Sequence, residues 1–147
     1  MKPANMIVLL LAAAGMAFAA LCAADPAEPD KGAKKAELRI FELRTYSVPD
    51  GKMDALHARF HDITCKYFEK HGITIVGFWT PNDPKEAETK LVYLLAHPSK
   101  EAAEKNWKAL GEDADFRAAF AATEKDGKLV DKVESVFLNP ADYSPLK

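Results

Sequence analysis

Residues 56–79 join an amphipathic helix directly to a hydrophobic strand. Apolar residues recur in and just before this stretch at spacings of three and four, which places them on one stripe of a helix: Met53, Leu56, Phe60, Ile63 and Tyr67. Charged residues fall largely outside that stripe: Asp54, Arg59, Asp62, Lys66 and Glu69. The helix is therefore predicted to bury one face and to leave the other in water.

Gly72 marks the end of this helix. Glycine accepts the left-handed conformation that closes many helices, and Lys70 and His71 lie where cations favour the negative end of the helix dipole. Residues 73–80 are then rich in β-branched and aromatic side chains, and a loop signal follows them: Pro81, Asn82, Asp83 and Pro84. We predict a strand over residues 73–80.

The rest of the domain repeats these elements. Ser99 is a suitable N-cap for a second helical region, which restarts at Asp113 and closes at Gly127. Three more strands are predicted, over residues 37–48, 91–97 and 129–138. The order is βαββαβ, which indicates an α+β, ferredoxin-like fold: a four-stranded antiparallel sheet with helices on one face.

The predicted strands carry apolar residues on both faces. In the first strand, Phe41 and Leu43 point one way, and Leu38, Ile40 and Tyr46 point the other. Two helices can cover only one face of such a sheet, so the second face needs another partner. A second copy of the chain satisfies this requirement, and we expect a homodimer that forms a dimeric α+β barrel.

Residues 1–24 have the features of a secretory signal peptide, with Lys2 ahead of an uncharged apolar run and small residues before Asp25. We expect export to the periplasm or the cell exterior. An uncleaved membrane anchor is the alternative, because the run is nearly long enough to span a bilayer. Residues 25–36 are rich in proline and charge and predict a disordered linker, which leaves residues 37–147 as one folded domain.

Charge and motifs narrow the function. Removal of residues 1–24 leaves 19 basic against 22 acidic residues, a net charge of −3, which argues against a nucleic-acid partner. Cys65 then has no partner for an internal disulfide. The sequence has no glycine-rich phosphate loop, CxxC pair, GxSxG motif or HExxH motif, and no cofactor is predicted.

His57, His61 and Cys65 stand at intervals of four and could offer metal ligands on one side of a helix. No carboxylate is fixed nearby by the sequence, so the favoured interpretation is a solvated helix flank, with His57 at a pocket edge as an alternative. We therefore predict no metal site. His71 and His97 are expected at the ends of elements.

Polar side chains on the first strand could serve a ligand. Glu42, Arg44 and Tyr46 alternate along one face, and Lys132 and Glu134 do so on the last strand. Ion pairs between these strands would satisfy them; the alternative is that Arg44 and Tyr46 project into a cavity. Aromatic residues could line an apolar pocket there, although core packing would also explain them. The candidate pocket comprises Arg44, Tyr46, His57, Trp79 and Tyr93.

Taken together, these segments resemble the NIPSNAP family. The matching segments are FELRTY (41–46), LHARF (56–60), FEKHGI (68–73), VGFWTP (76–81), LVYLLAHPS (91–99) and KVESVFLNPADYSP (132–145). The resemblance implies a dimeric α+β barrel, in agreement with the fold inferred from the residues. Family members often read RFRDHT in the first helix; here His61 replaces the second arginine and Ile63 replaces the histidine.

We expect a dimeric module that binds a small apolar or amphipathic molecule, or another protein. The alternative is an enzyme, because dimeric α+β barrels include cofactor-independent monooxygenases and haem proteins. In that case the resemblance implies Tyr46, His57 and Trp79 around the cavity, with His57 as a base or axial ligand.

Overall fold

The computed structural model of the chain describes residues 39–147, so the predicted signal peptide and linker lie outside the described residues. Four strands form one antiparallel sheet in the order β2-β3-β1-β4. They are β1 (Ile40–Ser47), β2 (Thr74–Trp79), β3 (Lys90–His97) and β4 (Lys132–Leu138).

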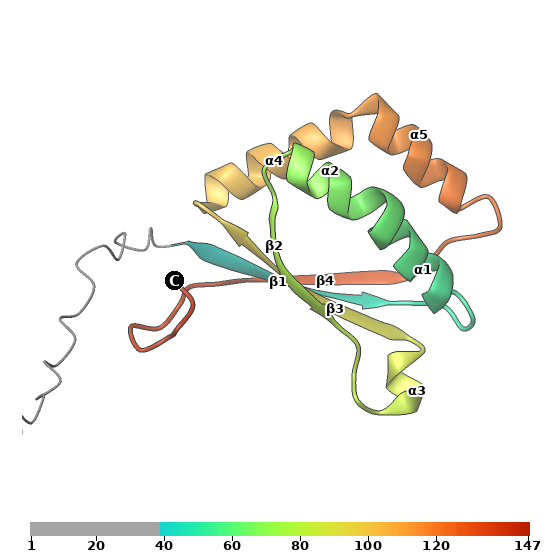
Figure 1. Cartoon of the computed structure of the whole chain (residues 1–147), viewed down its shortest axis with the longest axis horizontal. Coiled ribbons are helices and arrows are strands. Elements are labelled where there is room, and N and C mark those ends of the chain that lie inside the picture. Colours follow the sequence, from blue (N-terminus) through green and yellow to red (C-terminus); the bar gives the residue numbers. More distant parts are fainter. Residues whose placement is uncertain (1–38) are drawn as a thin grey trace, which may run out of the picture. The chain divides into compact units, whose positions relative to one another are not determined.

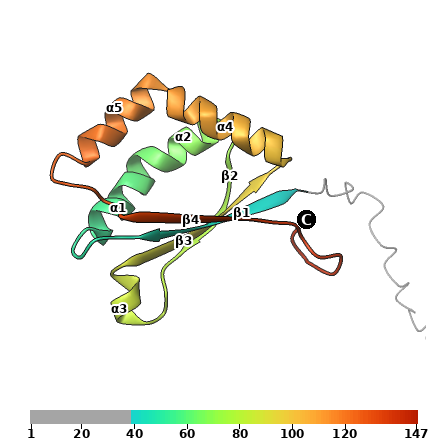
Figure 2. The same ribbon diagram turned by 180° about the vertical axis from the view of Figure 1, so that it is seen from behind.

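The helices are α1 (Met53–Arg59), the π-helix η1 (Phe60–Thr64), α2 (Cys65–Lys70), α3 (Pro84–Ala87), α4 (Lys100–Glu112) and α5 (Ala114–Thr123). Figures 1 and 2 show α1, α2, α4 and α5 in one layer over a single face of the sheet, with the short α3 on the other side. The predicted βαββαβ order and α+β class are confirmed. No helix in the described part of the chain is long and apolar enough to cross a membrane.

The core lies between the helical layer and the sheet. Its large side chains are at most 6% exposed: Leu56, Phe60, Phe68, Ile73, Leu91, Tyr93 and Leu95. Burying one such side chain contributes about 1.5–3 kcal/mol relative to leaving it in water. Phe60 and Tyr93 meet edge to face with ring centroids 5.3 Å apart, so aromatic packing joins η1 to β3.

The first helical region contains a π-helical turn, which the apolar spacing does not predict. The wider turn of η1 shifts the buried stripe by one residue. Phe68 is therefore buried, whereas Ile63 and Tyr67, which the spacing predicts as core, are only half-buried. Arg59 is predicted on the wet face and is instead buried.

Arg59 connects this helical region to α5. Its Nη1 donates a hydrogen bond to Glu124 at 3.0 Å, and its guanidinium lies 4.2 Å from the ring centroid of Phe120. The Arg59 side chain is 2% exposed. Loss of Glu124 would therefore leave a buried charge without its partner, which is strongly destabilising.

The helix signals at residues 72 and 99 act as predicted. Gly72 has a φ of +70°, and the Ile73 amide donates to the Phe68 carbonyl at 2.8 Å, which closes α2. Ser99 Oγ accepts a hydrogen bond from the Ala102 amide at 3.1 Å and caps α4.

Asp113 joins three segments at the start of α5. Its Oδ1 accepts hydrogen bonds from the amides of Asp115 and Phe116, at 3.0 and 3.1 Å. Its Oδ2 lies 2.7 Å from Lys70 Nζ and 2.8 Å from His71 Nε2. The hydrogen bond from Lys70 leads the interactions that hold the pKa of Asp113 well below its usual range, so the carboxylate stays charged while it ties α2 to the α4–α5 junction.

Three of the four strands are shorter than predicted, whereas β3 begins one residue earlier than predicted, at Lys90. The first strand is predicted over 37–48 and observed over Ile40–Ser47, with residues 37 and 38 outside the described part. The last is predicted to begin at Leu129, which is buried but precedes the strand. The sequence predicts Asp83 in a loop. In the structure its side chain caps α3 by accepting hydrogen bonds from the amides of Lys85 and Glu86.

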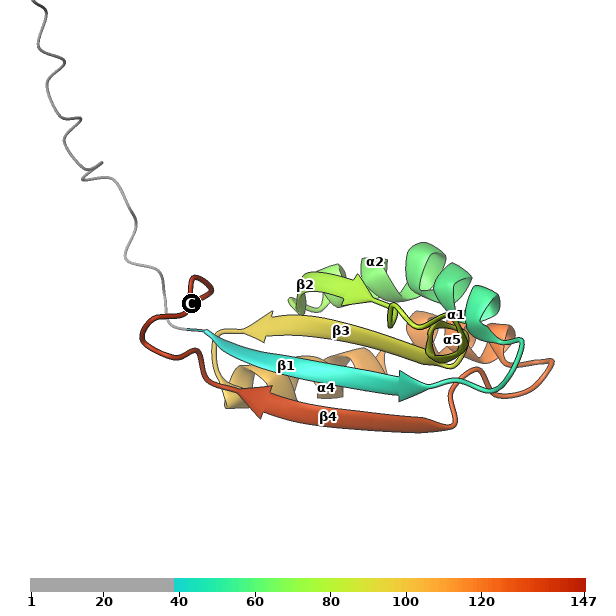
Figure 3. The ribbon, with the colours of Figure 1, turned by 90° about the horizontal axis from the view of Figure 1, so that it is seen from below.

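The sheet face opposite the helices carries exposed apolar side chains, with the charged Lys132 and Glu134 of β4 beside them. Figure 3 shows this face with the helices behind the strands. The pairing register places Trp79 and Val136 on it, and they are 52% and 55% exposed. Leu138 lies on the same face beside the tail that follows β4. We call this the open sheet face; it is the second apolar surface that the two-sided strands predict.

Candidate functional site

A buried carboxylate, Glu42, lies at the centre of a polar cluster on the helix-facing side of β1. Its Oε2 accepts a hydrogen bond from Trp107 Nε1 at 2.7 Å and lies 3.2 Å from His97 Nε2. Its Oε1 accepts from Ser135 Oγ at 2.7 Å and from Arg44 Nη1 at 3.3 Å. Glu42 is 3% exposed, so donors from four elements replace water around its charge. We call these five residues the Glu42 cluster.

The cluster favours the charged form of Glu42. Burial alone raises the pKa of a carboxyl group, but the hydrogen bonds from His97, Ser135 and Trp107, with the charge of Arg44, outweigh burial and lower the pKa from 4.5 to about 2. His97 fits as a donor when Nε2 carries its proton. Nδ1 of His97 is buried and has no hydrogen-bond partner among residues 39–147.

Arg44 is fixed by two contacts. Its guanidinium lies 4.3 Å from the ring centroid of Trp107, and Nη1 donates to Glu42. Nε of Arg44 is buried and has no partner within the described part of the chain. The side chain as a whole is 17% exposed. Arg44 therefore has a positioned guanidinium that is partly exposed, while its unpaired Nε donor is buried.

Two tyrosines extend this polar strip along the sheet. The Tyr93 hydroxyl donates to the Tyr46 hydroxyl at 2.8 Å. Burial raises the pKa of Tyr93, which keeps its proton on the oxygen. The guanidinium of Arg44 lies 5.9 Å from the ring centroid of Tyr46. The structure thus brings together three of the five predicted pocket residues.

The helices leave β4 uncovered beside the Glu42 cluster. The register places Arg44 opposite Ser135, and Val133 and Phe137 lie two residues to either side of Ser135 on the same face. Although this face points toward the helical layer, Val133 and Phe137 are 44% and 39% exposed. We call Arg44, Val133, Ser135 and Phe137 the β4 surface; it combines one cation with exposed apolar area.

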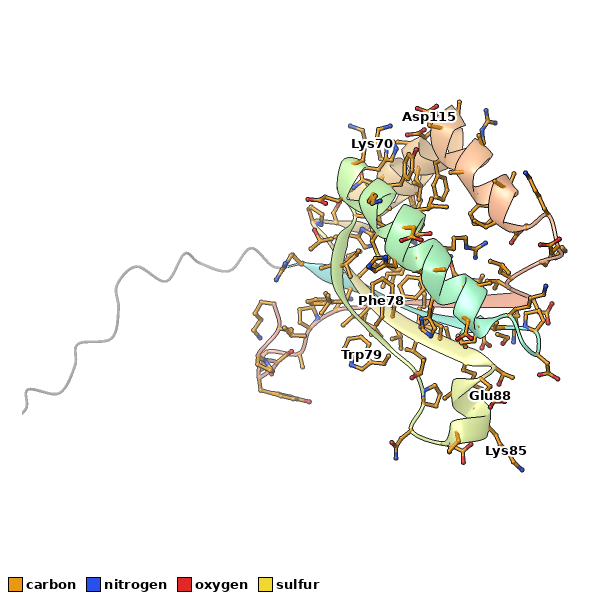
Figure 4. The ribbon with its side chains drawn as sticks, turned by 45° about the vertical axis from the view of Figure 1, so that its right-hand side comes forward. Lys70, Phe78, Trp79, Lys85, Glu88 and Asp115 are labelled. Atoms are coloured by element: carbon orange, nitrogen blue, oxygen red, sulfur yellow. The ribbon has the colours of Figure 1, made fainter. Side chains whose placement is uncertain are left out.

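The other two predicted pocket residues lie elsewhere. Figure 4 shows Trp79 and Phe78 on opposite sides of β2, with Phe78 toward the helices and Trp79 on the open sheet face. His57 is exposed on α1 and lines a separate hollow of about 230 Å³ with Phe60 and Leu91. The structure brings neither residue to the Glu42 cluster.

His61 and Cys65 line the same hollow as His57. Within residues 39–147, no group of three or more His, Cys, Asp or Glu side chains is arranged to hold a metal ion. His61 instead lies 2.7 Å from Asp62 on the helix surface. Burial raises the pKa of the Cys65 thiol, which disfavours the reactive thiolate.

The apolar pattern does not identify three donors of the Glu42 cluster: His97, Trp107 and Ser135. The sequence pattern groups Glu42 with Arg44 and offers Lys132 and Glu134 of the last strand as their partners. In the structure, Lys132 Nζ instead donates to Glu134 Oε1 at 2.8 Å. The sequence signal for such a cluster is Glu42 itself, an acid within a strand that is apolar on both faces. A carboxylate buried in such a strand needs hydrogen-bond donors. The donors lie 55 to 93 residues away in the sequence, so the signal does not name them.

Comparisons with known proteins give one family. The NIPSNAP family model matches residues 41–145. A NIPSNAP family protein from Agrobacterium tumefaciens superposes with a TM-score of 0.65 at 19% identity, over 74% of this chain and 99% of that one. An uncharacterised NIPSNAP domain protein from Burkholderia xenovorans gives 0.62 at 22% identity, over 72% and 98%. A Streptomyces coelicolor monooxygenase in complex with nanaomycin D gives 0.50 at 15% identity, over 71% and 89%. No curated protein matches the chain.

Proposed function

We propose that this chain, which belongs to the NIPSNAP family, is a dimeric module that binds a small amphipathic molecule. The observation that carries the proposal is the β4 surface, where a fixed guanidinium adjoins exposed apolar side chains. Small-molecule sites are mostly apolar and contain a few polar groups that set the orientation of the ligand. Arg44 is such a group, because Glu42 and Trp107 hold it in place.

Dimerisation through the open sheet face is the second part of the proposal. Trp79, Val136 and Leu138 expose apolar area there, on the side of the sheet away from the helical layer. Removing apolar area from water contributes roughly 25 cal/mol per Å². A two-fold symmetric pair brings the same face of each copy together, so one patch serves as both halves of the interface.

Native mass spectrometry of the purified protein tests both parts. We expect twice the chain mass, with additional mass from a retained small molecule. Arg44→Gln should lose the additional mass and remain dimeric, whereas Val136→Asp should give monomers because it buries a charge in the interface. Arg117→Gln, on the exposed side of α5, is the matched control and should change neither. A wild-type monomer would contradict the dimer, and equal retention by Arg44→Gln would contradict the site.

A second candidate function is a cofactor-independent oxygenase. The fold similarity to a monooxygenase in complex with nanaomycin D supports it. His57, the predicted base or haem ligand, is exposed on α1, away from the Glu42 cluster. Tyr46, whose hydroxyl accepts from Tyr93, is the better-placed acid or base. Oxygen uptake with a naphthohydroquinone substrate should then fall in Tyr46→Phe; no uptake by the wild type would argue against an oxygenase.

Export remains a separate proposal, which rests on the composition of residues 1–24. Cleavage could follow Ala19 or Ala24, so N-terminal sequencing of the protein recovered from cells should begin at Ala20 or Asp25. Recovery of the intact N-terminus in the membrane fraction would favour the anchor instead.

A further inference from the structure

We infer that a hollow beside η1 binds a small, neutral aromatic molecule that carries a hydrogen-bond donor. The hollow has a volume of about 230 Å³ and is separate from the β4 surface, so the inference does not rest on the function proposed for that surface. We call it the η1 hollow. It is lined by six side chains from α1, η1, α2, β2 and β3: His57, Phe60, His61, Cys65, Phe78 and Leu91.

The π-helical turn explains how residues spaced four apart come to line one hollow. In a regular helix each step of four residues turns about 40° past a full circle, so Cys65 would lie about 80° around the helix from His57. The turn at η1 takes up one additional residue, equivalent to about 100°, and returns Cys65 to within about 20° of His57. Turns of this kind are rare and recur at functional sites, which favours a binding role for the wall that they build.

The inner wall of the η1 hollow is aromatic and apolar. Phe60 is 6% exposed and Leu91 is 1% exposed, and Figure 4 shows Phe78 directed toward the helices. The rings of Phe60 and Phe78 meet edge to face with centroids 5.2 Å apart, so a flat ring placed against them would extend an existing aromatic cluster. An apolar cavity of ~150 Å³ takes benzene, so the η1 hollow has room for two fused rings.

The polar groups of the η1 hollow indicate a neutral ligand with a donor. None of the side chains that line it within the described part of the chain carries a permanent charge, so no group there would pair with an ion. His57 and His61 are exposed at the rim. Nδ1 of His61 lies 2.7 Å from Asp62 Oδ1, and because a carboxylate only accepts, this nitrogen carries the proton. Nε2 of the neutral imidazole is then an acceptor, which an O–H or N–H group of a ligand would pair.

The η1 hollow is compatible with the proposed dimer. Phe78 and Leu91 belong to the helix-facing side of the sheet, opposite Tyr93 and Tyr46 in the pairing register. The proposed interface lies on the open sheet face, on the other side of the strands. Dimerisation there would leave the hollow accessible from solution.

Matched pairs of probes test the ligand class. Titration of the full protein by NMR with indole and 1-methylindole, and with 2-naphthol and 2-methoxynaphthalene, compares a donor with its methylated form on the same rings. We expect indole and 2-naphthol to bind about 3- to 10-fold more tightly than their methylated forms, the range for one neutral hydrogen bond. His61→Ala should abolish this preference, and His61→Gln, whose amide oxygen accepts, should restore part of it. Arg117→Ala, on the exposed side of α5, is the matched control and should keep the full preference.

Alkylation of Cys65 locates the bound probe without any variant. Cys65 lines the η1 hollow, so saturation with 2-naphthol should slow its reaction with iodoacetamide several-fold, as measured on the peptide that carries this residue. Cys65→Phe, which places a larger side chain in the hollow, should weaken the binding of all four probes.

Three results would overturn the inference in different ways. Equal binding of the donors and their methylated forms would refute the donor requirement. Binding of 2-naphthol without slower alkylation of Cys65 would place the site outside the η1 hollow. Failure of all four probes to bind would refute the whole inference and leave the function proposed for the β4 surface standing.

Discussion

Replacement of Glu42 by glutamine should remove a stabilising charge that depends on pH. The pKa of Glu42 falls from 4.5 to about 2 in the folded chain. One pKa unit corresponds to about 1.4 kcal/mol, so the charged carboxylate contributes about 3 kcal/mol to the free energy of unfolding at pH 7. Glutamine keeps the shape but turns an NH₂ group toward two of the four donors, and this mismatch should also destabilise the fold.

The direction of the pH dependence follows from the lowered pKa. The contribution is complete above pH 4.5, where the carboxyl is charged in both the folded and the unfolded chain, and it is lost as the pH falls toward 2. By pH 3 the unfolded chain is mostly protonated at this position and the folded chain is not, so about 2 kcal/mol of the contribution should be gone. The difference in the free energy of unfolding between the wild type and Glu42→Gln should therefore decrease on acidification.

Urea unfolding of both proteins at pH 7 and pH 3 measures how the difference between their free energies of unfolding changes with pH. Other acids, among them Asp113, titrate equally in both proteins and cancel to first order. Glu104→Gln, an exposed site on α4, should differ little from the wild type at both pH values. A difference between the wild type and Glu42→Gln that stays constant from pH 7 to pH 3 would show that the four donors do not favour the charged form, and would refute the reasoning.

Three further substitutions probe the rest of the structure. Val136→Asp on the open sheet face should halve the mass measured by light scattering after size exclusion, and an unchanged mass would place the interface elsewhere. Asp113→Ala should lower the urea midpoint by more than Ser99→Ala does. Asp113 caps α5 and also binds Lys70 and His71 at the end of α2, whereas Ser99 makes one cap hydrogen bond. Equal midpoints would argue against the contribution of Asp113 to holding α2. Gly72→Ala should cost about 1 kcal/mol in a urea titration, since φ is +70° there and a left-handed residue with a Cβ is strained; no loss would mean that the helix end can rearrange.

The parts of the fold that depend on local chemistry could be predicted from the sequence. Gly72 stops α2 because its backbone accepts a positive φ, and Ser99 and Asp113 start α4 and α5 because their side chains accept nearby amide hydrogens. The predicted alternation of side chains between the two faces of each strand is also observed, because successive side chains of a pleated strand point to opposite faces. Each of these signals acts within a few residues.

The predictions fail where packing across the chain decides the outcome. A π-helical turn needs only one additional residue in a helix, and the spacing of Phe60, Ile63 and Tyr67 fits a regular helix equally well. Arg59 is buried because Glu124, from a distant segment, meets it. Trp79 and Tyr93 are both aromatic residues in neighbouring strands, yet they lie on opposite faces of the sheet, which depends on the register of β2 and its irregularity between Ile75 and Gly77.

The composition of the Glu42 cluster bears on why the chain retains it. Charged groups inside a protein often contribute no more stability than apolar side chains of the same size would, because burial offsets their attraction. The residue of β3 that pairs with Glu42 is the buried Leu95, so an apolar replacement would have an apolar neighbour there. What the charged version adds is the orientation of Arg44, since Glu42 fixes one nitrogen and Trp107 fixes the plane. A guanidinium held in this way has little freedom to lose when a ligand binds, which is the property expected of a recognition site rather than of a core.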